Sequence, residues 1–436
     1  MPNEHLIAYQ KPSFLLPGET VDLHKWAVIA CDQFTSQPEY WQEVEKIVGD
    51  SPSTYRLILP EAYLDTPRAE EHSQQTYHSM QEYLAQGIFN EYHGYVFIER
   101  NLGDTTRRGL LLNLDLEHYH FNEGSQSLIR ATEGTILDRL PPRIKIREKA
   151  QVEIPHIMVL IDDREDRLFT YLHDRRTSYQ KIYDFSLMQN SGSIQGFLVD
   201  PQGEQEIDSV FQSLCEPNTY SQKYHVEKNV LPLLFAVGDG NHSLATAKSI
   251  WDKIKDSVPP NHPARYALVE VVNIHDESLV FEPIHRVLFN FHNNIQALMK
   301  KFYHDKLQIL EINSFEQLQK EIRQVSTVQK IGVVQNNRFF LIQFEDPSAT
   351  LAIGTLQPFL DHLIEEHRSI NMDYVHGDSV LEKLCTRDES VGFLLPAMQK
   401  NDFFRTVIVD GSFPRKTFSM GDAREKRFYL ECRKIQ

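Results

Sequence analysis

Cysteine is scarce in this sequence, and its spacing fits neither a metal site nor a disulfide framework. The four cysteines lie far apart and include no Cys-x-x-Cys pair. Structural zinc sites and the disulfide scaffolds of secreted proteins both depend on close, regular cysteine spacing. We therefore expect no structural zinc and four reduced thiols, as found in a reducing compartment such as the cytoplasm.

Long hydrophobic runs are also missing. The longest largely apolar stretch, residues 231–237, is far shorter than the ~20 residues that a membrane-spanning helix needs. The first residues carry Glu4 and Lys11 and have no apolar core of the kind found in a signal peptide. We expect a cytoplasmic protein with no membrane partner.

Positive charge is in deficit, because 45 Lys and Arg residues stand against 61 Asp and Glu residues, which gives a net charge of −16. A field of this sign repels the phosphate backbone of nucleic acids, so nucleic acid is not an expected partner. The composition, 41% hydrophobic and 24% charged, is that of a folded globular protein. The expected partner is a small-molecule substrate, and the sequence carries no signal for an oligomeric state.

Helical and strand-like periodicities alternate along the whole chain, which predicts an α+β fold. Helices are predicted over 36–49, where Ser36 and Glu39 have capping-box spacing, over 68–86 and 356–367, and from Ser243 and Ser314 onward. A hairpin is predicted at residues 336–337. The predicted strands are 26–31, 95–100, 109–116, 157–161, 168–172, 231–237, 266–274, 279–289, 307–311, 392–396, 406–409 and 427–430.

The expected architecture is a mixed sheet core with flanking helices and a smaller α+β subdomain. At 436 residues the chain is too long for one ordinary core. We place a main α+β domain at residues 1–289 and a small α+β subdomain at 290–350. A C-terminal segment at 351–436 is expected to pack back on the main domain.

The densest cluster of polar residues joins a predicted buried strand to a predicted helix, at residues 237–248 (VGDGNHSLATAK). Its glycines let the backbone approach a ligand, and the amide groups at the start of a helix favour an anion. We predict a phosphate- or nucleotide-binding turn, with Asp239 as a metal ligand and His242 as a catalytic acid or base. The predicted phosphate-binding residues are Gly238, Asp239, Gly240, Asn241, His242 and Ser243.

The alternative for this segment is a purely structural turn in which Asn241 or Ser243 caps the helix. The turn is not a Walker A loop, because no Gly-Lys-Ser/Thr follows it. It is not a full dinucleotide fingerprint either, because the pair Gly238 and Gly240 lacks the third glycine. Ordinary P-loop and Rossmann sites are therefore excluded.

A second polar patch covers residues 130–139 (RATEGTILDR). Arginines that clamp an anion, with a carboxylate base nearby, suit an anionic substrate. The alternative is a solvated helix face on which opposite charges pair. We predict Glu133 as a candidate catalytic base, and the predicted substrate-binding residues of this patch are Arg130, Thr132, Thr135, Asp138 and Arg139.

Two further segments carry candidate residues. Asp32 stands between a predicted strand and a predicted helix, where a carboxylate can act as a catalytic base or a magnesium ligand, or can only cap the turn. Arg415 lies among the basic and hydroxyl groups of residues 413–422. It is a candidate for contacting a phosphate from another module, and the alternative is an ordinary charge on an exposed hairpin.

Four segments resemble the bacterial and archaeal family known as domain of unknown function 1015: 26–41 (WAVIACDQFTSQPEYW), 238–247 (GDGNHSLATA), 281–288 (FEPIHRVL) and 414–421 (PRKTFSMG). Many relatives carry His and Arg where Asn241 and Ser243 stand here. The His-His-Arg form of the turn is similar to one in the ParB/sulfiredoxin-like fold, which includes nucleotide-dependent free-serine kinases. In those kinases the turn holds nucleotide phosphates. The resemblance implies that residues 238–243 hold phosphate and that Asp32 or Glu133 is the base.

These observations favour an enzyme, a kinase-like phosphotransferase acting on a small hydroxylated metabolite such as serine. Such chemistry depends on positioning and charge neutralisation, which these loops offer. The expected cofactors are ATP or ADP and Mg²⁺. The alternatives are a phosphatase of a small phosphomonoester and a non-catalytic nucleotide- or metabolite-binding protein, which the loss of the family's His–Arg pair favours.

Overall fold

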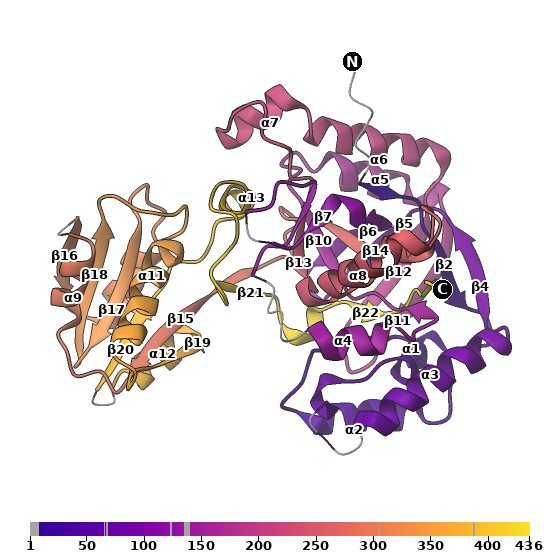
Figure 1. The fold of residues 1–436 in the computed structure, drawn as a ribbon, viewed down its shortest axis with the longest axis horizontal. Coiled ribbons are helices and arrows are strands. Elements are labelled where there is room, and N and C mark those ends of the chain that lie inside the picture. The colour runs from indigo at the N-terminus through magenta and orange to yellow at the C-terminus, as the bar shows by residue number, and fades with distance from the viewer. Residues whose placement is uncertain are drawn as a thin grey trace. The chain divides into compact units, whose positions relative to one another are not determined.

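The computed structural model describes residues 8–64, 66, 69–122, 124–134, 140–304, 306–386 and 389–436. The chain divides into two compact units (Figure 1): unit 1 is Met1–Leu279 together with Asp422–Gln436, and unit 2 is Val280–Gly421. Unit 2 is thus a continuous insertion in the sequence of unit 1. It takes in the segment 290–350 and most of the segment 351–436.

Unit 1 is built on a mixed sheet with ten described strands, in the order β11-β12-β5-β6-β14-β10-β13-β8-β7, with β1 paired to β6. The pairs β10–β14, β13–β8 and β7–β8 are parallel. This arrangement confirms the predicted α+β class with a mixed sheet core. The strands are β1 (Tyr9–Gln10), β5 (Val96–Asn101), β6 (Thr106–Asp115), β7 (Tyr119–His120), β8 (Ile129–Arg130), β10 (Met158–Ile161), β11 (Gln180–Ser186), β12 (Ser193–Leu198), β13 (Phe235–Asp239) and β14 (Tyr266–Asn273).

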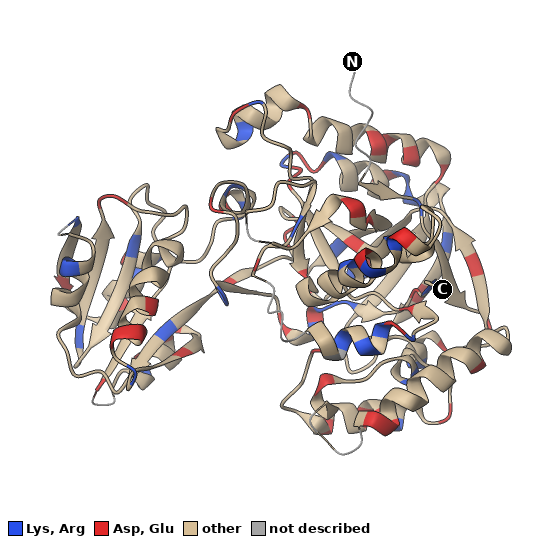
Figure 2. Cartoon of the chain, viewed as in Figure 1, with Lys and Arg blue, Asp and Glu red and all other residues tan. Residues whose placement is uncertain are grey.

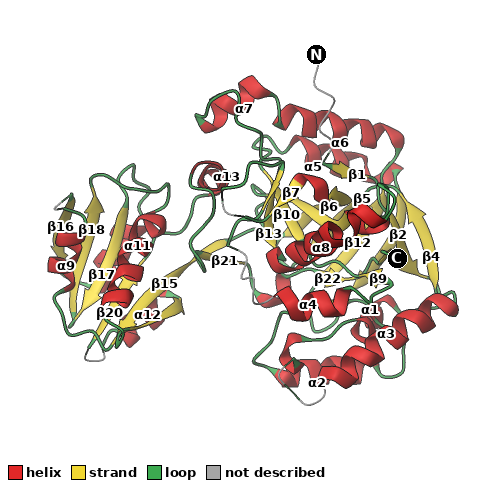
Figure 3. Cartoon of the chain, in the orientation of Figure 1, coloured by secondary structure: helices red, strands yellow, loops and turns green. Residues whose placement is uncertain are grey.

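The sheet is covered on both faces, because neighbouring residues of its strands enter different hydrophobic clusters. Phe97 of β5 packs in a cluster with residues of α5, α6 and α8, whereas Val96 and Ile98 pack in a second cluster with residues of α2 and α3. Figure 3 shows these helices around the sheet. The helices of unit 1 are α1 (Leu23–Trp26), α2 (Pro38–Val48), α3 (Ala69–Ala85), α4 (Leu140–Arg147), α5 (Arg167–Arg175), α6 (Pro201–Leu214), α7 (Pro217–Tyr224) and α8 (Asn241–Ile254).

The described part of unit 1 also contains three short strand pairs, and two of them use its C-terminal segment. They are β2 (Ser13–Pro17) with β4 (Phe89–His93), β3 (Val28–Ile29) with β22 (Phe428–Tyr429), and β9 (Val152–Glu153) with β23 (Arg433–Lys434). All three pairs are antiparallel. The segment Asp422–Gln436 is therefore part of the fold of unit 1.

Unit 2 has its own antiparallel sheet, in the order β16-β18-β17-β20-β15-β19, with β21 paired to β15. The predicted hairpin is present, since Asn336 and Asn337 have φ angles of 52° and 57° between β17 and β18. The elements are β15 (Phe281–Phe289), α9 (Ile295–Phe302), β16 (Leu307–Ile312), α10 (Phe315–Arg323), β17 (Lys330–Gln335), β18 (Arg338–Phe344), α11 (Ala352–Glu366), β19 (Asn371–His376), α12 (Asp378–Leu384), β20 (Ser390–Leu394), α13 (Lys400–Val409) and β21 (Phe418–Met420).

Several predicted elements differ from the structure in type or in bounds. The strand predicted at 231–237 is observed as β13, which begins at Phe235 and ends at Asp239. The apolar residues 168–172 and 406–409 lie in helices α5 and α13, not in strands, because a short apolar run has no period that separates the two. The strand predicted at 26–31 is limited to Val28–Ile29, and Trp26 ends α1. Helix α2 begins at Pro38 with Gln37 as its N-cap, so Ser36 and Glu39 do not form the predicted capping box.

No helix within the described ranges has the length and apolar character that crossing a membrane requires.

Candidate functional site

The predicted phosphate turn has the expected setting between a strand and a helix. Strand β13 ends at Asp239, and α8 begins at Asn241 with Gly240 as its N-cap, at a φ of 84°. A Cβ atom on Gly240 would lie 3.0 Å from the side chain of Ile157, and one on Gly238 would lie 3.0 Å from that of Leu160. Close packing against residues 157 and 160 is therefore enough to explain why both positions are glycine, and no bound ligand is needed for that explanation.

The start of α8 is suited to an anion. Its N-cap, Gly240, offers no side-chain oxygen to the first amide groups of the helix. Those amide groups have no intrahelical acceptor and lie at the positive end of the helix dipole. With fourteen residues, α8 is long enough for that dipole to develop, so its first turn is a place where a phosphate group can bind.

Asp239 pairs with a lysine that the sequence analysis did not select. Its Oδ1 atom accepts a hydrogen bond from the Gly240 amide at 3.0 Å, and its Oδ2 atom lies 3.0 Å from Lys426 Nζ. Among the described residues no group of three or more His, Cys, Asp or Glu side chains could hold a metal ion. A Mg²⁺ ion beside Asp239 would need phosphate oxygens and water as its other ligands, which is the usual arrangement at nucleotide sites.

His156 joins this turn to Asp32. The Nε2 atom of His156 lies 3.3 Å from Ser243 Oγ and 4.0 Å from Asp32 Oδ2. His156 is 9% exposed, and it precedes β10, which runs antiparallel to β13. Two predicted site residues from distant parts of the sequence therefore meet at one imidazole ring, which the sequence analysis missed.

Tyr429 holds the other nitrogen of that ring. Its Oη atom lies 2.8 Å from His156 Nδ1, accepts a hydrogen bond from the Cys31 amide at 3.2 Å and donates one to Cys31 Sγ at 3.1 Å. Tyr429 lies on β22, which pairs with β3 just before Cys31. This short strand pair places the Tyr429 hydroxyl beside the segment that carries Asp32.

The carboxyl group of Asp32 lies beside a thiol and a phenol, and the pKa values of these groups are shifted in opposite directions. Burial alone would raise the pKa of Asp32, but His156, a hydrogen bond from Gln33 and the charge of Lys426 together lower that pKa below its ordinary value. Burial raises the pKa of the Cys31 thiol to about 12 and that of Tyr429 well above its ordinary value. Cys31 is therefore a neutral thiol at physiological pH and not a nucleophile.

Asn241 and Thr132 tie the turn to the second polar patch. The Thr132 amide donates to Asn241 Oδ1 at 3.3 Å, and Asn241 Nδ2 donates to Thr132 Oγ1 at 3.4 Å. The Thr132 hydroxyl donates to the carbonyl of Val237 at 2.6 Å. These bonds fix the backbone of the turn from the side of β8.

Arg130 is buried, with 3% of its surface exposed. Its guanidinium donates to the carbonyls of Ser127 and Leu231 and to Gln126 Oε1, at 2.9, 2.8 and 3.2 Å. Burial lowers its pKa. Through these contacts Arg130 stabilises the backbone that precedes β8 and the segment at Leu231, which is a structural role.

The other predicted residues occupy varied positions. His242 is half-buried in the first turn of α8, where its carbonyl accepts a hydrogen bond from Thr246 at 2.7 Å. Glu133 is half-buried. Arg415 belongs to unit 2, where its carbonyl accepts a hydrogen bond from Arg286 at 3.0 Å. The predicted residues that lie outside the described ranges are Thr135, Asp138 and Arg139.

The basic residues of α4 are paired with carboxylates. Helix α4 packs against α8 and appears as a run of blue segments in Figure 2. Arg143 pairs with Glu61 and Arg147 with Glu153, while Lys145 Nζ lies 3.6 Å from Glu70. Opposite charges therefore pair along this helix and offset much of its positive field.

Two buried arginines hold the segment that carries Lys426. Arg100 donates to the carbonyl of Arg424 at 2.6 Å and also to those of Glu425 and Lys426, and Arg107 donates to the carbonyl of Glu425 at 2.7 Å. Arg100 is 2% exposed and Arg107 is 4% exposed. The backbone before β22 is thus fixed, and Lys426 is held in place beside Asp239.

Residues 15–363 match the protein family described as Protein of unknown function (DUF1015). The chain belongs to the DUF1015 family. This match confirms the resemblance to the family and includes three of its four segments, while residues 414–421 lie beyond it. No curated protein matches the chain.

The chain is also distantly similar to solved structures. A free serine kinase variant in complex with AMP has a TM-score of 0.40 and 9% identity over 75% of this chain and 91% of the other. A conserved hypothetical protein from Pyrococcus furiosus has a TM-score of 0.35 and 10% identity over 75% and 95%. SbnI from Staphylococcus aureus, with a C-terminal truncation, has a TM-score of 0.34 and 9% identity over 73% and 85%. The resemblance to the ParB/sulfiredoxin-like fold stays a prediction.

Proposed function

We propose that this DUF1015-family protein is a phosphoryl-transfer enzyme of the kinase type, acting on a small hydroxylated metabolite such as serine. The observation that carries the proposal is the meeting of Asp32 and Ser243 at His156. These contacts support the proposal because Asp32 and the start of α8, which can attract a phosphate group, both lie next to His156. Phosphoryl transfer requires such a combination, because it depends on positioning and charge neutralisation.

In this proposal the first turn of α8 and Lys426 bind the phosphates of ATP or ADP. Asp32 accepts the proton of the acceptor hydroxyl, whose oxygen then bonds to the terminal phosphorus atom while the shortened nucleotide leaves. Asp239 would be the protein ligand of Mg²⁺, and the ion, when bound, would neutralise phosphate charge. The lowered pKa of Asp32 keeps this base ionised at neutral pH.

The test uses the intact protein in a thermal-shift screen with ATP, ADP and AMP, each with and without Mg²⁺. We expect stabilisation by a nucleotide, followed by nucleotide consumption when a panel of hydroxylated metabolites including serine is added. Asp32→Asn should keep the thermal shift and lower the turnover rate by about 10²-fold or more, since it removes a general base. Asp104→Asn, at an exposed carboxylate, is the matched control.

The other outcomes have distinct meanings. A thermal shift with no turnover for any acceptor would indicate a nucleotide-binding protein. Stabilisation only by phosphoserine or another phosphomonoester would indicate a phosphatase. A protein that responds to none of these compounds would contradict the proposed function.

A further inference from the structure

We propose that Ser243 and His156 form a nucleophile–base pair and that the Ser243 hydroxyl accepts a phosphoryl group covalently. The inference rests on the proposed function in one respect, namely that a phosphoryl group binds at the start of α8. A serine nucleophile is recognised by a base within hydrogen-bond reach and by a third group that orients the base. Ser243, His156 and Tyr429 have this arrangement, with separations of 3.3 and 2.8 Å.

The hydrogen bonds of Tyr429 are compatible with the His156 tautomer that the proposal needs. A tyrosine hydroxyl has one proton, and Tyr429 donates it to Cys31 Sγ at 3.1 Å. With that direction, the bond between Tyr429 Oη and His156 Nδ1 is donated by Nδ1–H. Neutral His156 consequently carries its lone pair on Nε2, the atom that lies next to Ser243 Oγ. Ser243 is thus placed to donate its proton to His156.

The surroundings of the pair favour proton transfer from Ser243 to His156. Asp32 Oδ2 lies 4.0 Å from His156 Nε2, so a carboxylate is close to the imidazolium that would form. Lys426 acts on Asp32 electrostatically and pairs with Asp239, so a cation stands beside the incoming phosphate. Ser243 itself lies in the first turn of α8, where the helix dipole favours negative charge.

The chemical step balances without an added oxidant or reductant. Ser243 Oγ forms a bond to the phosphorus atom of a phosphoanhydride or phosphomonoester, and its proton moves to His156 Nε2. The bond between that phosphorus atom and the oxygen of the leaving group breaks, and that oxygen keeps the electron pair. The leaving group is a nucleotide when the substrate is a phosphoanhydride and an alcohol when it is a phosphomonoester. The product is a phosphoserine at position 243. An acceptor hydroxyl or water can attack its phosphorus atom in turn, so the transfer takes two displacements instead of the single one described above.

The experiment uses a fluorophosphonate probe, because it places a phosphorus atom with a fluoride leaving group before a serine nucleophile. We expect a single adduct on Ser243, located by mass spectrometry of the intact protein and of its peptides. Ser243→Ala should abolish labelling. Ser249→Ala is the matched control on the same helix, since that hydroxyl donates only to the carbonyl of Ala245 in the described contacts, and it should label at the wild-type rate.

Two further variants separate the base from its orienting group. His156→Gln keeps an amide near the position of Nε2 but cannot accept the proton, so it should label about 10²-fold more slowly. Tyr429→Phe removes the bond to Nδ1 and should slow labelling about tenfold or more. Thermal unfolding of each variant checks that the protein remains folded. Wild-type labelling rates in His156→Gln, or an adduct that persists in Ser243→Ala, would overturn the inference.

Nucleotide turnover on the same samples separates this inference from the proposed function. Wild-type protein that consumes nucleotide but forms no Ser243 adduct would overturn the covalent step and leave the proposed function in place. Labelling of Ser243 without any response to nucleotides would retain the nucleophile–base pair and remove the kinase proposal.

Discussion

Lys426 brings a positive charge to a turn whose own residues, 238–243, include no Lys or Arg. Its Nζ atom lies 3.0 Å from Asp239 Oδ2, and its side chain is 17% exposed. The ammonium group can donate to a bound phosphate and to Asp239 at the same time, because Lys has three N–H donors. The affinity for nucleotide should therefore depend strongly on this residue.

We expect Lys426→Ala to weaken nucleotide binding about tenfold or more, since a hydrogen bond to a charged group contributes about 1.5–3 kcal/mol. Isothermal titration with ATP or ADP measures the change. Lys434→Ala is the control, because Lys434 is an exposed lysine of the same C-terminal segment that pairs with Glu91 at 3.4 Å. Equal affinities in the two variants would argue against a phosphate contact at Lys426.

The φ angle and packing of Gly240 give a separate prediction about stability. Gly240→Ala should lower the free energy of unfolding by about 1–3 kcal/mol, because alanine is strained at a left-handed backbone position and its Cβ would press on Ile157. Gly87 also has a positive φ, of 65°, but a Cβ atom added there would have no neighbour within 4 Å. Gly87→Ala should therefore lower the free energy of unfolding by less. Urea unfolding of both variants is the measurement. A larger loss in Gly87→Ala would refute the packing argument.

The sequence predicted some of the site's residues and missed others for a physical reason. Residues 238–243 were found because polar groups and glycines cluster locally between a strand and a helix. His156, Lys426 and Tyr429 carry no local motif. Their proximity depends on the antiparallel pairing of β10 with β13 and of β22 with β3, and long-range pairing of this kind leaves no periodic pattern in one sequence.

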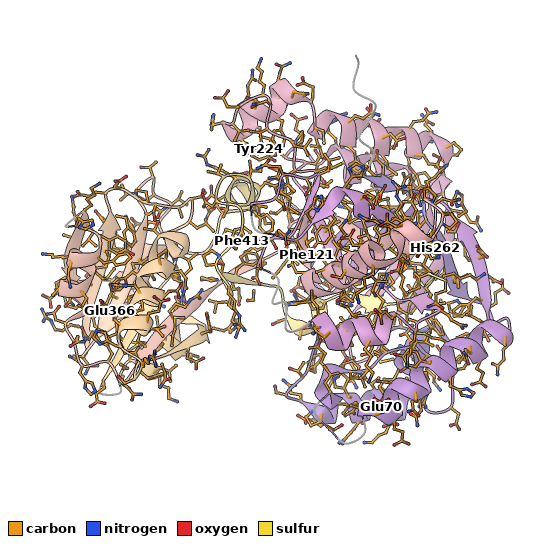
Figure 4. The ribbon with its side chains drawn as sticks, in the orientation of Figure 1. Glu70, Phe121, Tyr224, His262, Glu366 and Phe413 are labelled. Atoms are coloured by element: carbon orange, nitrogen blue, oxygen red, sulfur yellow. The ribbon has the colours of Figure 1, made fainter. Side chains whose placement is uncertain are left out.

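At the scale of elements, helix α7 is attached to the end of β10 by a buried carboxylate. Asp162 is 3% exposed and accepts a hydrogen bond from Tyr224 Oη at 2.7 Å; Tyr224 is labelled on α7 in Figure 4. His275 Nε2 and Lys223 Nζ lie 2.7 and 3.1 Å from the same carboxylate. Burial alone would raise the pKa of Asp162, but these three groups lower it to about 2.

Asp162→Asn should therefore lower the free energy of unfolding by about 2 kcal/mol at pH 7. Since the pKa of Asp162 is lower in the folded state than in the unfolded state, its stabilisation is complete above about pH 4 and is lost as the pH falls toward 2. Denaturant unfolding of wild type and variant between pH 7 and pH 2 measures this. A difference that persists unchanged at pH 2 would contradict the ionic role of Asp162.

The prediction of elements succeeded where a pattern was long enough to have a period. The strands predicted at 95–100 and 109–116 are observed as β5 and β6, which pair with each other, and residues of both strands enter both hydrophobic clusters. The apolar run Thr406 to Val409 was read as a strand, yet it ends α13, where consecutive positions are buried. A helix that is packed on more than one side has apolar residues at consecutive positions, so its sequence shows no clear 3.6-residue period. Four residues are also too few to reveal such a period.

At the scale of the whole molecule, unit 2 is continuous in sequence whereas unit 1 is not. Unit 2 contains a complete antiparallel sheet and its own hydrophobic cluster, which includes Val287, Leu318 and Leu381. Unit 1 depends on residues 422–436, because Arg427 is buried against Glu270 and Glu431. The two units should therefore respond differently to truncation.

We expect a fragment of residues 280–421 to fold alone and to unfold cooperatively in urea, as measured by circular dichroism. A chain that ends at Gly421 should lose the cooperative transition of unit 1, since it leaves Glu270 buried without its arginine, and breaking a buried pair costs about 3–5 kcal/mol. Adding residues 422–436 as a separate peptide is the control and should restore part of the transition. Full cooperativity of unit 1 without that segment would refute its structural role.

The insertion of unit 2 also sets an order of events during protein synthesis. At about 5–20 residues per second, a ribosome needs on the order of ten seconds to pass through residues 280–421 before Lys426, Arg427 and Tyr429 can be added. During that interval the first 279 residues lack the strand that brings the Tyr429 hydroxyl to His156. Unit 2 can therefore finish folding before unit 1, although its codons come later, and a chain released early from the ribosome carries no assembled site.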